Sequence, residues 1–135
     1  MIQRIQTIWL LAASACGFIT LQLPFYIGSI GALPAERFTA LGNLPLLILT
    51  IAAAITGFVA IFLYKNRSLQ LKLTIAAFAV AIINVALFFS KTQTYNTGGI
   101  ALSSVFAFAA PVFYALAIRN IYRDQKLVKS LDRLR

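Results

Sequence analysis

Long apolar runs separated by short polar segments set the pattern of this chain. Four runs reach the roughly 20 apolar residues that a helix needs to cross a bilayer. They cover residues 7–30, 44–64, 71–90 and 99–118. Their Ala, Leu and Phe content favours helices over barrel strands, which would alternate apolar and polar residues over about ten positions. Because the connections are short, the pattern predicts an all-α membrane protein, an antiparallel bundle of four transmembrane helices, with residues 1–135 in one domain.

Several residues refine the predicted ends of these helices. Asn43, Ser68 and Thr97 stand where they can cap the second, third and fourth helices. Pro24 and Pro111 fall inside predicted spans, where proline is expected to kink a helix.

Lys and Arg are divided unequally between the two ends of the predicted bundle. One end holds ten of them: Arg4, three in residues 65–72 and six in residues 119–135. The other end holds only Arg37 and Lys91. Because cytoplasmic loops collect Lys and Arg, the charges predict a multi-pass protein with both termini in the cytoplasm.

The segment 119–135 predicts an amphipathic, basic C-terminal cytoplasmic helix. On a helical wheel its cations share an arc of about 120°; they are Arg119, Arg123, Lys126, Lys129 and Arg133. The opposite side is mainly apolar, although Asp124 and Asp132 interrupt it, and holds Ile121, Leu127, Val128, Leu131 and Leu134. Such a helix can contact anionic lipid headgroups, dock onto a protein partner or a second copy of the chain, or only fix the topology. Nucleic acid is not expected as a partner, because the charge lies against a membrane and no aromatic platform accompanies it.

Composition narrows the chemistry further. The chain is 61% hydrophobic and 11% charged, whereas soluble domains have about 45–50% apolar and about 25% charged residues. It has no histidine, one cysteine and three acidic side chains, so the usual zinc, haem and iron–sulfur ligand sets are missing. Without a nucleophile–base set or a buried pair of carboxylates, we predict a protein that is not an enzyme and binds no metal or cofactor.

The single cysteine, Cys16, raises an alternative for the first span. The stretch "ASAC" after Arg4 and an apolar run is a loose lipoprotein cleavage site. However, the apolar run continues well past Cys16, whereas the apolar part of a signal peptide covers about 7–15 residues. We therefore expect Cys16 to be a packing residue in an intact span.

Neutral polar residues within the predicted spans fall in the outer third of the membrane. They are Gln22, Thr50, Asn84, Ser103 and Ser104. One interpretation is a layer of interhelical hydrogen bonds, with Gln22 bonded to Asn84. The other is a shallow pocket for a lipid headgroup or a small polar ligand.

Both ends of the sequence resemble a known family. "MIQRIQT" at residues 1–7 and "KLVKSLDRLR" at residues 126–135 are similar to the ends of a domain-of-unknown-function family of small four-span membrane proteins from Bacteroidota. The resemblance implies a bacterial cytoplasmic (inner) membrane protein. It does not point to any particular activity. It directs attention to the cytoplasmic junction between the chain ends, formed by Gln3, Arg4, Gln6, Arg119, Asn120 and Arg123.

The sequence is compatible with two different functions. One is a non-enzymatic accessory or assembly component whose basic tail meets lipid or a cytoplasmic partner. The other is a small oligomeric transporter or channel for a neutral or lipid-like solute. A transporter predicts a continuous polar cavity that includes Gln22 and Asn84, whereas an accessory protein predicts a dry bundle.

Overall fold

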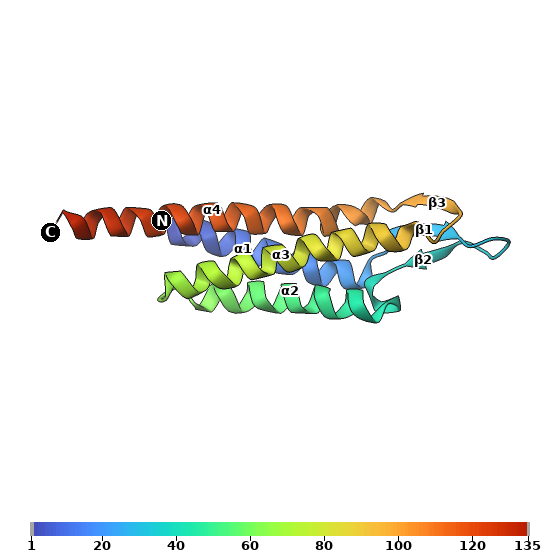
Figure 1. Ribbon diagram of the computed structural model, residues 1–135, viewed down its shortest axis with the longest axis horizontal. Helices are drawn as coiled ribbons and strands as arrows, with labels where there is room; N and C mark the ends of the chain where they lie inside the picture. The colour runs from blue at the N-terminus through green and yellow to red at the C-terminus, as the bar shows by residue number, and fades with distance from the viewer. Residues whose placement is uncertain (1, 135) are drawn as a thin grey trace.

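Four long helices form an elongated bundle in the computed structural model, which describes residues 2–134, with side chains from residue 5 onward. The helices are α1 (Ile2–Gln22), α2 (Leu44–Phe62), α3 (Arg67–Thr92) and α4 (Val105–Arg133). They lie along one long axis, and the chain reverses direction after each of the first three helices (Figure 1). All four are long and apolar enough to cross a membrane, which confirms that prediction and fits a multi-pass membrane protein.

The helices close into a ring in which α1 and α3 each contact both α2 and α4. Small residues fill the centre, among them Ala13, Ala60, Ala77 and Ala117, each at most 1% exposed. Such small residues let the helix backbones approach closely, as is common where helices associate in membranes, and Leu10, Tyr114 and Ile121 are buried in the same core. Large apolar side chains instead cover the outside of the bundle; Ile8, Leu11, Ile48, Phe58 and Ile82 are among them.

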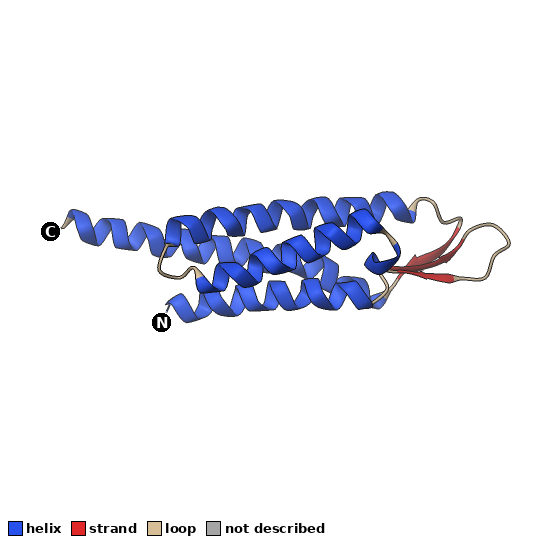
Figure 2. Cartoon of the chain, turned by 90° about the horizontal axis from the view of Figure 1, so that it is seen from below, coloured by secondary structure: helices blue, strands red, loops and turns tan. Residues whose placement is uncertain are grey.

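A three-stranded antiparallel sheet caps one end of the bundle, so the all-α prediction is wrong there. It consists of β1 (Tyr26–Ser29), β2 (Glu36–Phe38) and β3 (Thr97–Ile100), in the order β2-β1-β3. Figure 2 shows the strands beyond the helix ends, and we call this the sheet end. Because β1 pairs with β2 along one edge and with β3 along the other, the sheet ties the α1–α2 connection to the α3–α4 connection.

The first helix is shorter than predicted, because it ends at Gln22 and not at residue 30. Pro24, which has no N–H to continue the helical bonding, lies just beyond this end and produces no kink within the helix. Phe25 then turns inward, is 1% exposed and stacks on Phe88 with 4.4 Å between the ring centroids. This aromatic contact anchors the chain where it leaves α1 and enters the sheet.

The predicted caps also need correction. Thr97 lies in β3, and a short 3-10 helix, Leu102–Ser104, precedes α4, so the fourth helix does not begin at residue 99. Asn66, rather than Ser68, caps α3 by accepting a hydrogen bond from the backbone N–H of Leu69. Asn43 does occupy the N-cap position of α2, but its side chain makes no capping bond. Pro111 lies inside α4, which continues through it as one helix.

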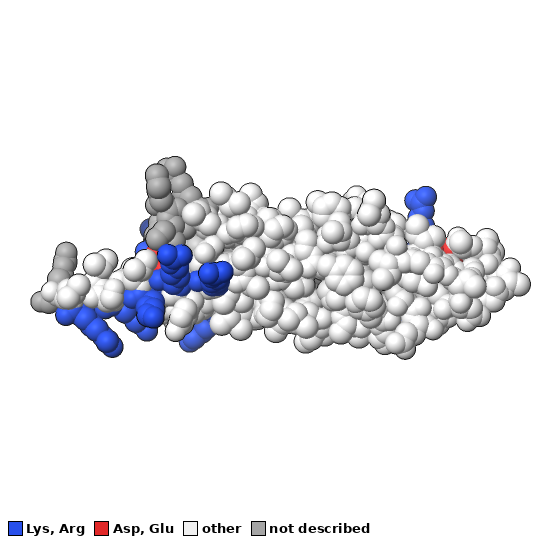
Figure 3. Space-filling view, turned by 90° about the horizontal axis from the view of Figure 1, so that it is seen from above, with Lys and Arg blue, Asp and Glu red and all other residues white. Residues whose placement is uncertain are grey.

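At the opposite end α4 extends beyond the other helices (Figure 1). All residues from 126 to 134 are exposed. Lys and Arg side chains gather at this end, while the long middle of the visible face carries no charge (Figure 3). We call it the basic end and define it as residues 64–67 together with residues 119–134.

Candidate functional site

The predicted junction between the chain ends lies at the basic end, but only part of it comes together. The buried Gln6 side chain donates a hydrogen bond from Nε2 to the backbone oxygen of Asn120, at 3.1 Å. Arg119 and Arg123 are exposed and have no hydrogen bond to Gln6 among the described residues. The side chains of Gln3 and Arg4 lie outside the described part of the chain. What the structure shows here is a contact that joins the first turns of α1 to α4.

An ion pair joins the start of α3 to α4 at nearly the same level. Arg67 Nε lies 3.6 Å from Asp124 Oδ2, and the side chains are 27% and 11% exposed, respectively. Asp124 therefore points into the bundle, which explains why an acidic residue interrupts the apolar side of the amphipathic pattern. Within residues 5–134, Asp124 Oδ2 has no hydrogen-bond donor, so Arg67 is its charge partner.

A groove opens beside this ion pair, between the α2–α3 turn and α4. Its volume is about 620 Å³. Its lining consists of Tyr64, Lys65, Asn66, Arg67, Gln125, Val128 and Lys129. A smaller adjoining hollow of about 130 Å³ shares Gln125 and Lys129 and adds Tyr122 and Lys126. The basic end therefore contains a concave surface lined by cations from two separate parts of the chain.

The tail cations that were predicted to contact lipid do not all line one common surface. All five, Arg119, Arg123, Lys126, Lys129 and Arg133, are exposed, but only Lys126 and Lys129 line the two hollows. In the sequence, Lys65 and Arg67 contributed to the charge count that predicts the orientation of the helices. They were not predicted to belong to a binding site. No local signal could have placed them beside Lys129, because that proximity depends on how α3 packs against α4.

The apolar residues of the tail are also divided by the packing. Ile121 is fully buried in the bundle, and Val128 lines the groove. Leu127, Leu131 and Leu134 stay exposed, the last two at 63% and 84%. Because α4 continues along the bundle axis (Figure 1), the last turns of α4, which carry these leucines, extend past the ends of the other helices.

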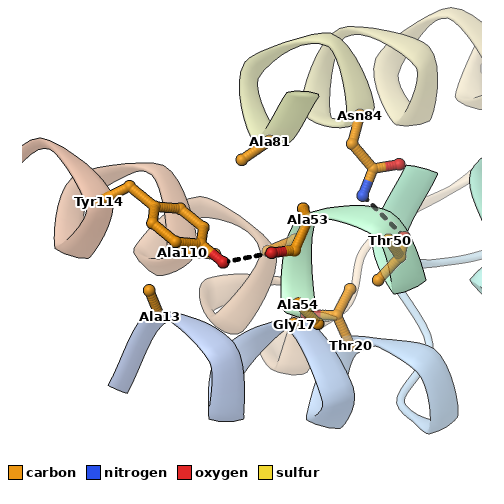
Figure 4. Close-up of a pocket in the computed structure, with 11 residues that line it drawn as sticks. Ala13, Gly17, Thr20, Thr50, Ala53, Ala54, Ala81, Asn84, Ala110 and Tyr114 are labelled. Carbon is orange, nitrogen blue, oxygen red and sulfur yellow. Dashed lines mark hydrogen bonds between the residues drawn. The ribbon is translucent and has the colours of Figure 1, made fainter. Parts of the chain in front are cut away.

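The predicted outer polar layer is only partly formed. Asn84 donates from Nδ2 to Thr50 Oγ1 at 2.7 Å (Figure 4), and Thr50 donates to the backbone oxygen of Leu46 at 2.7 Å. This chain of bonds joins α3 to α2. The predicted bond between Gln22 and Asn84 is wrong, because Gln22 is the exposed last residue of α1.

The two serines belong to the sheet end rather than to a common layer with Asn84. Ser103 donates a hydrogen bond to the backbone oxygen of Pro24, which holds the start of α4 against the chain that leaves α1. Ser104 is buried in the 3-10 helix that precedes α4. Their hydrogen bonds and burial give them structural roles.

A small cavity lies at the centre of the bundle (Figure 4). Its volume is about 20 Å³, which is enough for a single water molecule. Mostly small side chains surround it, including Ala13, Gly17, Ala53 and Ala81, together with Asn84. It is far too small for a solute, and Gln22 is not part of its lining.

We expect Asn84→Leu to change the free energy of unfolding by no more than about 1 kcal/mol. The substitution removes the bond to Thr50, but it also removes Asn84 Oδ1, a buried acceptor with no partner within the described chain. Hydrogen bonds between helices in a membrane are worth only about 0.6–2 kcal/mol, and replacing a partly satisfied polar group by an apolar one of similar size offsets that loss. Unfolding in detergent, followed by the fluorescence of Trp9, measures the change.

Thr50→Val serves as the matched substitution on the other helix. It removes the acceptor for Asn84 and leaves the whole Asn84 amide buried without a partner, so it should be the more destabilising of the two. An Asn84→Leu loss well above that of Thr50→Val would contradict this account of the polar contact.

The comparisons with known proteins identify the family. The model of the family described as "Domain of unknown function (DUF4293)" matches residues 2–134. The chain therefore belongs to this family. No curated protein and no solved structure matches the chain.

Proposed function

We propose that this member of a family of unknown function is a non-enzymatic accessory or assembly component of the cytoplasmic membrane in a bacterium of the Bacteroidota. It forms an antiparallel four-helix bundle that crosses the membrane, with its basic end in the cytoplasm. There it contacts anionic lipid headgroups or a cytoplasmic partner through α4 and the α2–α3 turn. The observation that carries the proposal is the convergence of basic side chains around a groove at one end of an otherwise apolar bundle.

The distribution of charge supports this orientation. Seven of the twelve Lys and Arg residues lie in the basic end, whereas Arg37 and Lys91 lie toward the sheet end. Cytoplasmic segments next to membrane helices are enriched in Lys and Arg. Each cation near an anionic membrane surface contributes roughly 1 kcal/mol of binding free energy. The same charges can therefore set the topology and bind lipid.

The alternative function, a transporter or channel, has less support. A pathway for a solute requires a polar cavity that continues between the helices. The central cavity measures about 20 Å³ and is lined mostly by Ala, Gly and Thr. The interior resembles the dry bundle expected of an accessory protein.

We expect the tagged full chain, purified from native membranes in a gentle detergent, to retain anionic phospholipid in excess of the bulk membrane composition. Mass spectrometry of the extracted lipids, and of any co-purifying proteins, measures this retention. A protein that carries only bulk lipid and no cytoplasmic partner would contradict the accessory function.

Orientation is checked separately by cysteine labelling of intact cells in a Cys16→Ser background. A cysteine introduced at Ser130, in the exposed last turns of α4, must stay unlabelled by an impermeant reagent added from outside. A cysteine at the exposed Ala32, in the β1–β2 connection of the sheet end, must react.

A further inference from the structure

We infer that the groove between the α2–α3 turn and α4 binds the phosphate-containing headgroup of one anionic phospholipid, with Lys65, Arg67 and Lys129 as its charged contacts. The inference rests on the proposed function, because it requires the basic end to lie at the inner membrane surface. It adds a defined lipid site to what would otherwise be a diffuse attraction between a basic tail and the membrane.

The positive charge of the groove favours the binding of an anion. Three cations line it, and none of its lining residues is acidic. The nearby Asp124 is largely buried and faces Arg67, so the two lysines have no carboxylate partner in the groove lining. Cations held together in this way repel one another, and a bound phosphate relieves the repulsion through charge-assisted hydrogen bonds.

Neutral groups in the groove can also donate to a phosphate. Asn66 uses its Oδ1 to cap α3, so its amide NH₂ is the part that can serve a ligand, and the Gln125 amide lies across the groove. The groove also borders the first turn of α3, where the helix dipole favours negative charge. Arginine suits phosphate especially well, because its planar guanidinium can donate two parallel hydrogen bonds.

The size and position of the groove favour a lipid over free phosphate. Its volume of about 620 Å³ is in the range of pockets for whole small molecules, roughly 300–1,000 Å³. Tyr64 and Val128 give it apolar walls, which a glycerol backbone and the first acyl carbons can contact. Tyr64 follows the last turn of α2, and aromatic residues at such helix ends mark the membrane–water boundary.

The test measures binding of dioleoylphosphatidylglycerol and dioleoylphosphatidylcholine to the purified full chain in neutral detergent, by native mass spectrometry. The double variant Lys65→Gln/Lys129→Gln removes two groove cations. We expect it to bind the phosphatidylglycerol about 10-fold more weakly than the unmodified chain. Arg67 is left in place because its loss would also unpair Asp124.

The matched control is Arg119→Gln/Arg133→Gln, which removes the same charge from exposed positions outside the groove lining. We expect its affinity for phosphatidylglycerol to fall by about threefold at most, clearly less than that of the groove variant, because Arg119 and Arg133 attract the lipid only diffusely. Equal losses in the two double variants would overturn the inference in favour of diffuse attraction, and would leave the proposed function standing. All four substituted residues are exposed, and an unchanged unfolding transition verifies that each variant is folded.

A competition experiment distinguishes the two sources of phosphate. Inorganic phosphate or glycerol phosphate, added at the same concentration as the lipid, should leave phosphatidylglycerol bound. Displacement by either compound would overturn the lipid assignment, because the groove would then recognise phosphate without its membrane anchor. Phosphatidylcholine bound as tightly as phosphatidylglycerol would overturn it as well, because the site would then not depend on net negative charge.

Discussion

Gly57→Ala is expected to destabilise the bundle by about 2 kcal/mol, the usual cost of overpacking a core. A methyl group at Gly57 would lie 2.8 Å from both Ser14 Oγ and Tyr114 Cε1, and closer still to Tyr114 Oη. Tyr114 cannot easily give way, because it is 1% exposed and donates a hydrogen bond to the backbone oxygen of Ala53 at 2.6 Å. Helix propensity acts the other way, since alanine is favoured over glycine by about 1 kcal/mol, so a net loss shows that the steric clash dominates.

A double-mutant cycle identifies the cause of this loss. In a Tyr114→Phe background the hydroxyl that crowds Gly57 is gone, so Gly57→Ala should cost less, although the ring and Ser14 remain close. Gly42→Ala is the control, because a methyl group there would meet no described atom within 4 Å. Unfolding followed by Trp9, which stacks on Phe113 with 5.7 Å between ring centroids, provides the measurement. A Gly57→Ala variant as stable as the unmodified chain would disprove the close packing of the Tyr114 side chain against Gly57.

Arg67→Met is expected to destabilise the protein by about 2 kcal/mol. It leaves the carboxylate of Asp124, 11% exposed, without its charge partner. Removing one member of a fully buried ion pair costs about 3–5 kcal/mol. The value here should be smaller because Arg67 is 27% exposed, so solvent already screens part of the interaction.

The partner substitution should be milder. Asp124→Asn leaves Arg67, which can turn its guanidinium toward solvent or a lipid phosphate. The double variant Arg67→Met/Asp124→Leu should recover most of the stability, since it leaves no buried charge. Equal losses for Arg67→Met and Asp124→Asn would show that the ion pair is no more buried than an ordinary surface pair. The same unfolding assay compares all three variants.

The four apolar helices could be predicted from the sequence because the bilayer imposes a length that can be counted along the chain. Exclusion of water requires about 20 consecutive apolar residues, and α2 in particular begins at the predicted residue, Leu44. The sheet end could not be predicted in this way. Tyr26–Ser29 continues the apolar run of the first helix, so its composition conceals the change from helix to strand after Pro24. Its strand partners lie in two other loops, which hydropathy does not connect.

The same limit applies to the candidate site. The predicted tail cations are exposed, but which of them share a groove depends on Lys65 and Arg67, about sixty residues earlier in the chain. Asp124 broke the amphipathic pattern of the tail, and only the packing of α3 against α4 assigns it to Arg67. Likewise, the Asn84 amide was expected to bond Gln22, whereas the helix ring places Thr50 opposite it.

The sequence by itself determined how many helices are long and apolar enough to cross a membrane and which segments carry the basic residues, because both depend on hydropathy and charge summed along short stretches. Tertiary structure alone decided where α1 ends, how three loop segments pair into a sheet, and which cations surround the groove. Those features arise from contacts between residues far apart in the chain, whose energies depend on distance in space.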